Sequence, residues 1–107
     1  MLWTQTNCLT ETLFPSALET AKALDDYFTK TGKLKGPLHG VPISIKDNFQ
    51  IAGKASSAGF VGWANDVAEA DSSMVGLLKR QGAVVYVKTN VPTAMMIAET
   101  VNNLFGR

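Results

Sequence analysis

The feature that most constrains the fold of this chain is an uninterrupted run of β-branched and aromatic residues, Val84 to Val87, which Ala83 precedes. Such a run is typical of a strand covered on both faces, because a strand with one solvated face alternates apolar and polar residues. A helical pattern over Ser72 to Gln81 comes before it, and Gly82 separates the two. A helix, a short loop and a buried strand form half of a parallel βαβ unit. The run therefore predicts an α/β fold, with a short parallel or mixed sheet flanked by helices.

A second helix and a second strand are predicted upstream. Apolar residues recur at spacings of three and four from Pro15 to Lys30, which predicts a helix that Gly32 ends. Residues 41–46 alternate with a period of two, so alternate side chains share one face of a predicted strand. The apolar face would hold Val41, Ile43 and Ile45, and the other face Pro42, Ser44 and Lys46.

The remaining segments carry weaker patterns. Residues 50–70 are rich in small and polar residues without periodicity, and we expect a loop. Asp71 is predicted to cap the helix over Ser72 to Gln81. Pro92 is predicted to open a further short helix through Ala98. The residues expected to face inward from the helix after Asp71 are Met74, Val75, Leu77 and Leu78.

Length and composition exclude several classes of function. The 107 residues allow one domain at most, and 46% hydrophobic with 18% charged residues is an ordinary globular balance. A net charge of +1 gives no reason to expect binding to nucleic acid, and no apolar run is long enough to span a membrane. The single cysteine, Cys8, suits a reducing compartment, and the N-terminus lacks the pattern of a secretory signal. We therefore expect a cytoplasmic protein that uses no metal or cofactor.

Lys46 is the residue with the clearest chemical potential, and the residues alone leave two interpretations open. A lysine that closes a strand is most simply a solvated charge, because lysine is rarely buried without a partner. A lysine held among apolar neighbours would instead have a lowered pKa and could act as a general base near neutral pH. The other candidates receive structural interpretations: Ser56 and Ser57 as turn formers, His39 as a structural or exposed residue, and Lys88 as a solvated or structural lysine.

The stretch from Leu38 to Asp47 closely resembles the catalytic-lysine motif of the amidase signature family. Further motifs of that family follow in the same order, and the sequence from Asn90 to Arg107 looks most like that of fungal acetamidase-type enzymes. Ordered motifs at compatible spacing are far more specific than any one motif alone. They are the small-residue loop Gly53–Gly59, the helix start Ala70-Asp71, the turn into a strand Gln81–Val85, the motif Lys88–Pro92, and the stretch Glu99–Arg107.

The resemblance implies a hydrolase that converts a carboxamide to a carboxylate and ammonia by a Ser–cis-Ser–Lys mechanism, with Lys46 at the position of the catalytic lysine. It also implies that both serines and the glycine-rich oxyanion loop lie beyond the position of Arg107, and that a helical segment precedes residue 1. We therefore expect residues 1–107 to be a single partial domain, truncated at both ends relative to the family. The isolated chain is predicted to be inactive as an amidase.

Three functions are consistent with these observations. The chain can be a segment of an amidase that acts on a small-molecule amide, with substrate-binding residues that the sequence does not identify. It can be a truncated paralogue that serves as a non-hydrolytic homo-oligomeric module, because lost neighbours would leave strands 41–45 and 84–87 with open edges and apolar faces. In that case Met95, Met96 and Ile97 would be helical contributors to the interface. Finally, it can be a small repurposed enzyme that uses Lys46 as an amine nucleophile or proton shuttle.

Overall fold

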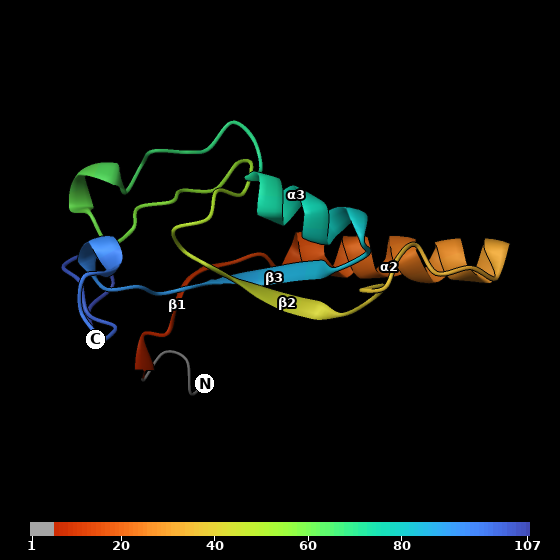
Figure 1. The fold of residues 1–107 in the computed structure, drawn as a ribbon, viewed down its shortest axis with the longest axis horizontal. Helices are drawn as coiled ribbons and strands as arrows, with labels where there is room; N and C mark the ends of the chain where they lie inside the picture. The colour runs from red at the N-terminus through yellow and green to blue at the C-terminus, as the bar shows by residue number, and fades with distance from the viewer. Residues whose placement is uncertain (1–5) are drawn as a thin grey trace.

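The strand predicted from the β-branched run is the central strand of a mixed sheet in the computed structural model, which describes residues 6–107. This strand, β3 (Val84–Thr89), lies between β1 (Leu9–Thr12) and β2 (Pro42–Lys46) (Figure 1). β2 and β3 are parallel and are connected through α3 (Ser73–Arg80), whereas β1 is antiparallel to β3. The α/β fold and the parallel βαβ unit are confirmed.

Both edges of β3 are paired, which explains why Val84, Val85 and Val87 are buried. The expectation that β3 is left with open edges is wrong. β1, a segment without a strand pattern, hydrogen-bonds to the C-terminal half of β3, and the N–H of Leu13 continues this pairing by donating to the carbonyl of Tyr86. The open edges of the sheet therefore belong to β1 and β2, among the residues that the structure describes.

The long helix α2 (Phe14–Thr31) confirms the prediction for residues 15–30. It ends at Gly32, whose φ of 66° is left-handed and whose N–H donates to the carbonyl of Phe28. α2 packs against the first half of β3 through Ala17 and Leu24, which form one core cluster with Val84. The predicted apolar stripe is only partly covered, because Leu18 and Phe28 remain 71% and 49% exposed.

α3 and the segment before it differ from the prediction in two respects. Ser72, not Asp71, is the N-cap residue that directly precedes α3, and the Asp71 carboxylate is occupied by the N–H of Ala52 and the ammonium of Lys79. Met74 and Leu77 are exposed, and Val75 is the only residue of α3 that is fully buried. A helix of eight residues that lies on one face of the sheet buries a single narrow stripe.

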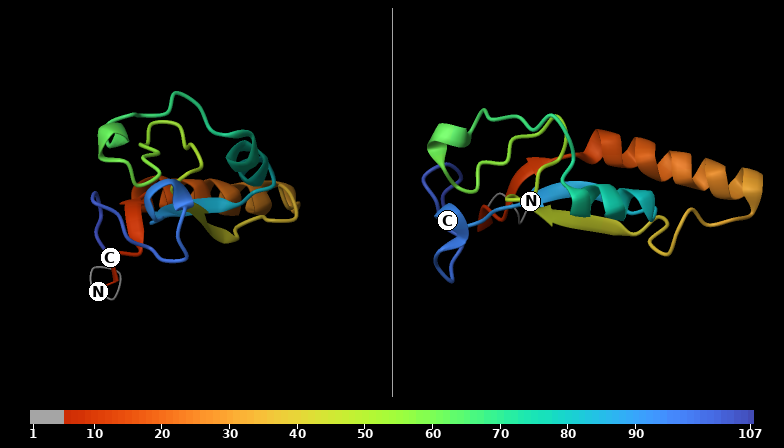
Figure 2. Two further views of the ribbon diagram at one scale, coloured as in Figure 1. Left: turned by 60° about the vertical axis from the view of Figure 1, so that its left-hand side comes forward. Right: turned by 45° about the horizontal axis from the view of Figure 1, so that its top comes forward.

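Different elements pack against the two faces of the sheet. α3 and the loop 50–70 lie above β2 and β3 in Figure 1, and Figure 2 gives two further views of this arrangement. That face holds the main core, which includes Ile45, Ile51, Val75 and Val85. The predicted alternation is confirmed within β2, because Ile45 is buried whereas Ser44 and Lys46 are exposed. Val41, predicted on the apolar face, lies before the strand and is 42% exposed. The predicted loop is also confirmed, apart from one 3-10 turn at Val61–Trp63.

The segment after β3 does not form the helix predicted from Pro92 to Ala98. It forms a short 3-10 turn, Thr93–Met95, in which Ala94 and Met95 have left-handed φ values of 54° and 57° that an α-helix cannot continue. Buried Asn102 holds the segment by donating to the carbonyl of Val91 and by accepting hydrogen bonds from two backbone N–H groups. Within residues 6–107, no helix is long and apolar enough to cross a membrane.

Candidate functional site

Lys46 lies at the C-terminal end of β2 and lines a pocket of about 270 Å³. The other walls come from residues 90–100, which follow the C-terminal end of β3 and include Asn90, Met95, Ile97 and Glu99. The two strands are parallel, so their C-terminal ends meet at the same edge of the sheet, and this brings residues far apart in sequence to one site. The Lys46 side chain is exposed at this pocket.

Among the described residues, Lys46 is the only basic side chain that lines this pocket. Glu99 is engaged with the guanidinium of Arg107, and the Asn90 amide is engaged with backbone groups and with Asn102. In the part of the chain that the structure describes, the lining of this pocket includes the hydroxyl residue Thr100 but no serine, cysteine or histidine. Lys46 therefore supplies the amine of this site, and an acyl transfer through a serine would need that serine from elsewhere.

On the opposite face of the sheet, Asp47 is the centre of a buried polar network. Its side chain is 2% exposed. Its Oδ1 accepts a hydrogen bond from the Thr10 hydroxyl (2.9 Å), and its Oδ2 accepts bonds from the Ser57 hydroxyl (3.2 Å) and the Ala58 N–H (3.0 Å). The ammonium of Lys88 lies 3.6 Å from Oδ1. The carboxylate thus joins β1, β2, β3 and the loop that follows β2.

Lys88 is the positive partner in this network and has no exposed surface. Its Nζ donates to the carbonyl of Ala55 (2.6 Å) and to the hydroxyl of Ser56 (2.7 Å). Burial lowers the pKa of Lys88 from its ordinary value, although the nearby carboxylates of Asp47 and Glu11 oppose the shift. Of the two interpretations made from the sequence, the solvated lysine is wrong and the structural lysine agrees with these contacts.

The serine pair and the histidine are held in structural contacts. Ser57 donates to Asp47, and Ser56 donates to the carbonyl of Phe49 while it accepts from Lys88. Both hydroxyls therefore hold the loop, as expected of turn formers. The Nδ1 of His39 accepts a hydrogen bond from a backbone N–H four residues upstream, which is a structural role within its turn.

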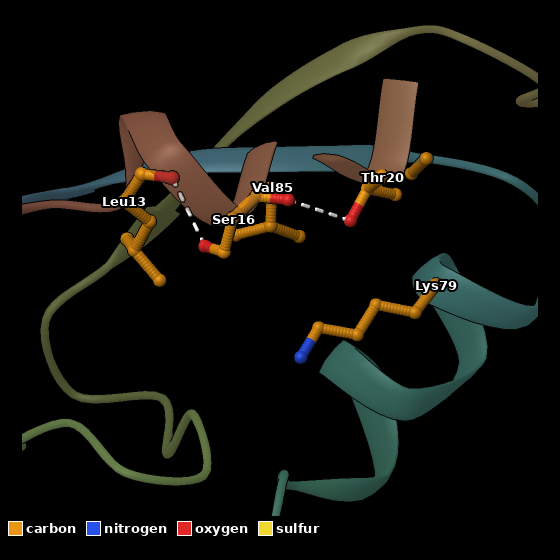
Figure 3. A pocket seen from close by; sticks show the side chains of 6 residues that line it. Leu13, Ser16, Thr20, Lys79 and Val85 are labelled. Carbon is orange, nitrogen blue, oxygen red and sulfur yellow. Dashed lines mark hydrogen bonds between the residues drawn. The ribbon is translucent and has the colours of Figure 1, made fainter. Parts of the chain in front are cut away.

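A second pocket, of about 210 Å³, lies between α2 and α3 (Figure 3). Its hydroxyls are used inside α2, because Ser16 donates to the Leu13 carbonyl and Thr20 to the Ser16 carbonyl. Its one cation, Lys79, is paired with Asp71 at 2.7 Å. Although partial burial raises the pKa of Asp71, hydrogen bonds from Lys79 and Ala52 hold it below its ordinary value. Among the described residues that line this pocket, Ser16, Thr20 and Lys79 are thus all engaged by other groups.

No group of three or more histidine, cysteine, aspartate or glutamate side chains that could hold a metal ion occurs among residues 6–107. The pocket at Lys46 is the candidate site, because it places the predicted lysine in a cavity at the C-terminal ends of β2 and β3. The sequence predicted no role for Asp47 and no role in the site for Lys88. The one available signal was the position of Lys88 directly after a fully apolar run, where a lysine side chain needs a partner.

Comparisons with known proteins agree with this geometry. The sequence profile of the family described as Amidase matches residues 2–107. The chain is 50% identical over 102 residues to Amidase 2 of Gibberella moniliformis and 46% identical over 102 residues to the acetamidase of Emericella nidulans. These matches cover 95% of this chain and 20% and 19% of the two relatives, so the chain spans about a fifth of their length.

Solved structures show the same fold. A fatty acid amide hydrolase superposes with a TM-score of 0.90 at 34% identity, over 94% of this chain and 18% of that protein. The peptide amidase of Stenotrophomonas maltophilia superposes with a TM-score of 0.72 at 36% identity, over 84% of this chain and 18% of that protein. The resemblance to fungal acetamidase-type enzymes is confirmed. With a family profile that matches nearly every residue and relatives that share half of them, the chain belongs to the amidase family.

Proposed function

We propose that this chain is the lysine-bearing segment of an amidase-type hydrolase that converts a small carboxamide to a carboxylate and ammonia. The observation that carries the proposal is the position of Lys46, at the end of a strand and in the lining of a pocket. Family membership supports the reaction type, and the match of Leu38–Asp47 to the family's catalytic-lysine motif supports Lys46 as the base.

In this proposal the reaction is an acyl transfer through a Ser–cis-Ser–Lys triad. A serine hydroxyl is a weak nucleophile that needs an adjacent base, and a neutral lysine amine can accept its proton. Both serines and the oxyanion donors would come from chain outside these 107 residues. A lysine is more easily neutral when water is removed from around it, and chain or substrate that covers the pocket would remove that water.

A chimera tests this proposal directly. The matched 102-residue stretch of the Emericella nidulans acetamidase is replaced by this chain, and ammonia release from acetamide is measured. We expect an active chimera in which Lys46→Ala lowers kcat/KM by about 100-fold or more, the scale of general base catalysis. Lys79→Ala, on α3 and outside the pocket, is the control and should keep the activity. Full activity of the Lys46→Ala chimera would refute the proposal.

The 107-residue chain by itself gives a second test. We expect no ammonia release above background, because the nucleophile and the oxyanion donors provide most of the rate enhancement in serine-type acyl transfer. Release that disappears in Lys46→Ala but survives Ser56→Ala and Ser57→Ala would instead support the repurposed enzyme that uses Lys46 without a serine.

A second candidate function is a non-hydrolytic, homo-oligomeric module. Beside α2 lies an entirely apolar groove of about 330 Å³, formed by α2 and β3, in which Leu18 is 71% exposed. This groove, together with the exposed Met96 and Ile97, offers apolar surface to a second copy. Light scattering at micromolar concentration should then give at least a dimer, which Leu18→Glu weakens and Glu19→Gln does not. A monomer at every concentration would exclude the module.

A further inference from the structure

We propose that the buried ion pair of Asp47 and Lys88 positions Lys46. The pair lies on the other face of the sheet from the pocket, and it fixes the place of the Lys46 amine relative to the opposite wall of that pocket. This inference rests on the proposed function of Lys46 as the base. Neither Asp47 nor Lys88 lines the pocket. Their effect must therefore pass through the backbone of β2 and through the loop that follows it.

The pair first fixes the end of β2. Consecutive strand residues point to opposite faces, so a fixed Asp47 also fixes the direction in which Lys46 leaves the sheet. The Asp47 N–H donates to the Thr89 carbonyl (2.9 Å), while its carboxylate is held by Thr10 from β1 and by Lys88 from β3. The residue after Lys46 is therefore held through both its backbone and its side chain.

The second step is the loop 55–59, which the same pair holds. Lys88 binds the Ala55 carbonyl and the Ser56 hydroxyl, whereas Asp47 binds the Ser57 hydroxyl and the Ala58 N–H. Every one of these four consecutive residues is therefore bound to one member of the ion pair.

The third step joins that loop to the pocket wall. The Ala58 carbonyl accepts a hydrogen bond from the Ala94 N–H (3.0 Å), and Gly59 lies so close to Thr93 that a Cβ on it would be 2.9 Å from the Thr93 Cα. Ala94 and Met95 have left-handed φ values. Non-glycine residues keep such a conformation only where surrounding contacts impose it. Loosening the loop should therefore release Met95 from its place in the pocket.

A merely structural ion pair would stabilise the fold without any effect on the pocket, and the test must separate the two roles. Replacing one partner leaves a buried unpaired charge and can unfold the chain, so the informative variant is Asp47→Asn/Lys88→Met, in which both charges are removed. The matched control is Asp71→Asn/Lys79→Met, an aspartate–lysine pair at 2.7 Å that lies outside the pocket.

The first measurement needs no activity. In the 107-residue chain with 13C-labelled methionine methyl groups, we expect the Met95 resonance to shift in the Asp47→Asn/Lys88→Met variant and to stay in place in the control pair. The Met74 resonance, from α3, is the internal reference and should not shift in the Asp47→Asn/Lys88→Met variant. A folded variant with an unmoved Met95 resonance overturns the inference, whether or not Lys46 is the base. A variant without the dispersed spectrum of a folded chain also overturns it, because the pair would then be required for the fold as a whole.

The second measurement uses the acetamidase chimera. Small misplacement of a catalytic group can cost about 100-fold in rate, so we expect the Asp47→Asn/Lys88→Met chimera to lose about that factor in kcat with KM nearly unchanged. Equal kcat in this variant and its parent, alongside an inactive Lys46→Ala chimera, would overturn the positioning role alone. An active Lys46→Ala chimera would instead refute the proposed function, and the Met95 resonance would still decide the inference.

Discussion

Replacing Lys88 with methionine should be among the most destabilising single substitutions in this chain. The lysine is fully buried, donates two hydrogen bonds and pairs with Asp47 at 3.6 Å. Methionine fills a similar volume but leaves the Asp47 carboxylate buried with no countercharge beside it. Removing one partner of a buried ion pair typically costs about 3–5 kcal/mol. That is a large part of the roughly 5–15 kcal/mol that stabilises an ordinary domain.

A double-mutant cycle makes the prediction specific to the pair. Asp47→Asn alone should cost a similar amount, because it leaves the Lys88 ammonium unpaired. The double variant Asp47→Asn/Lys88→Met contains no unpaired charge, so its cost should be well below the sum of the two single costs. The coupling should lie near the upper end of the roughly 0.5–3 kcal/mol measured for residues in contact.

Urea unfolding followed by circular dichroism provides the free energies, and the slope with urea shows whether each variant unfolds from the same compact state. Asp71→Asn/Lys79→Met is the control cycle. That pair is partly exposed, so its coupling should be about 1 kcal/mol or less. Additive costs at Asp47 and Lys88, or a Lys88→Met cost no larger than that of the exposed pair, would refute the reasoning.

Three further predictions concern stability. Burial lowers the pKa of Lys88 below its unfolded value, so at pH values between the two the unfolded chain binds more protons than the folded chain. The free energy of unfolding should therefore rise with pH as the pH approaches 10.5. This rise should be absent from the Lys88→Met variant. Gly36→Ala should cost about 1–3 kcal/mol, because its Cβ would lie 2.6 Å from the Gln81 carbonyl oxygen, whereas Gly62→Ala meets no atom within 4 Å. Asn102→Ala should make residues 99–107 sensitive to protease, because two backbone N–H groups lose their acceptor.

Each of these three predictions has a clear contrary result. If the difference in unfolding free energy between wild type and Lys88→Met did not change across the alkaline pH range, Lys88 would hold its proton equally well in the folded and unfolded states. Equal melting temperatures for Gly36→Ala and Gly62→Ala would mean that the backbone around Gln81 gives way without cost. Unchanged cleavage of the Asn102→Ala chain would show that other contacts hold the last residues.

The sequence alone determined those elements whose cause is local. α2 and the alternation of β2 follow from periodicity, because the helical repeat and the strand pleat decide which side chains share a face. The β-branched run predicted β3, and Gly32 supplied the left-handed residue that ends α2. Family membership and the position of Lys46 at a strand end could also be predicted, whereas its catalytic role stays a prediction.

Only the tertiary structure decided what depends on partners far apart in the chain. β1 has no strand pattern of its own and forms by pairing with the edge of β3 that β2 does not occupy. Thr93–Met95 does not start an α-helix because Ala94 and Met95 are left-handed, and the N–H of Ala94 donates to the distant Ala58 carbonyl. Lys88 gave no signal of its partner, since the groups that satisfy its charge come from residues 32 to 41 positions away. A charged side chain is tolerated in a core only where folding brings such partners within bonding distance. A local sequence pattern cannot predict which distant residues will lie that close.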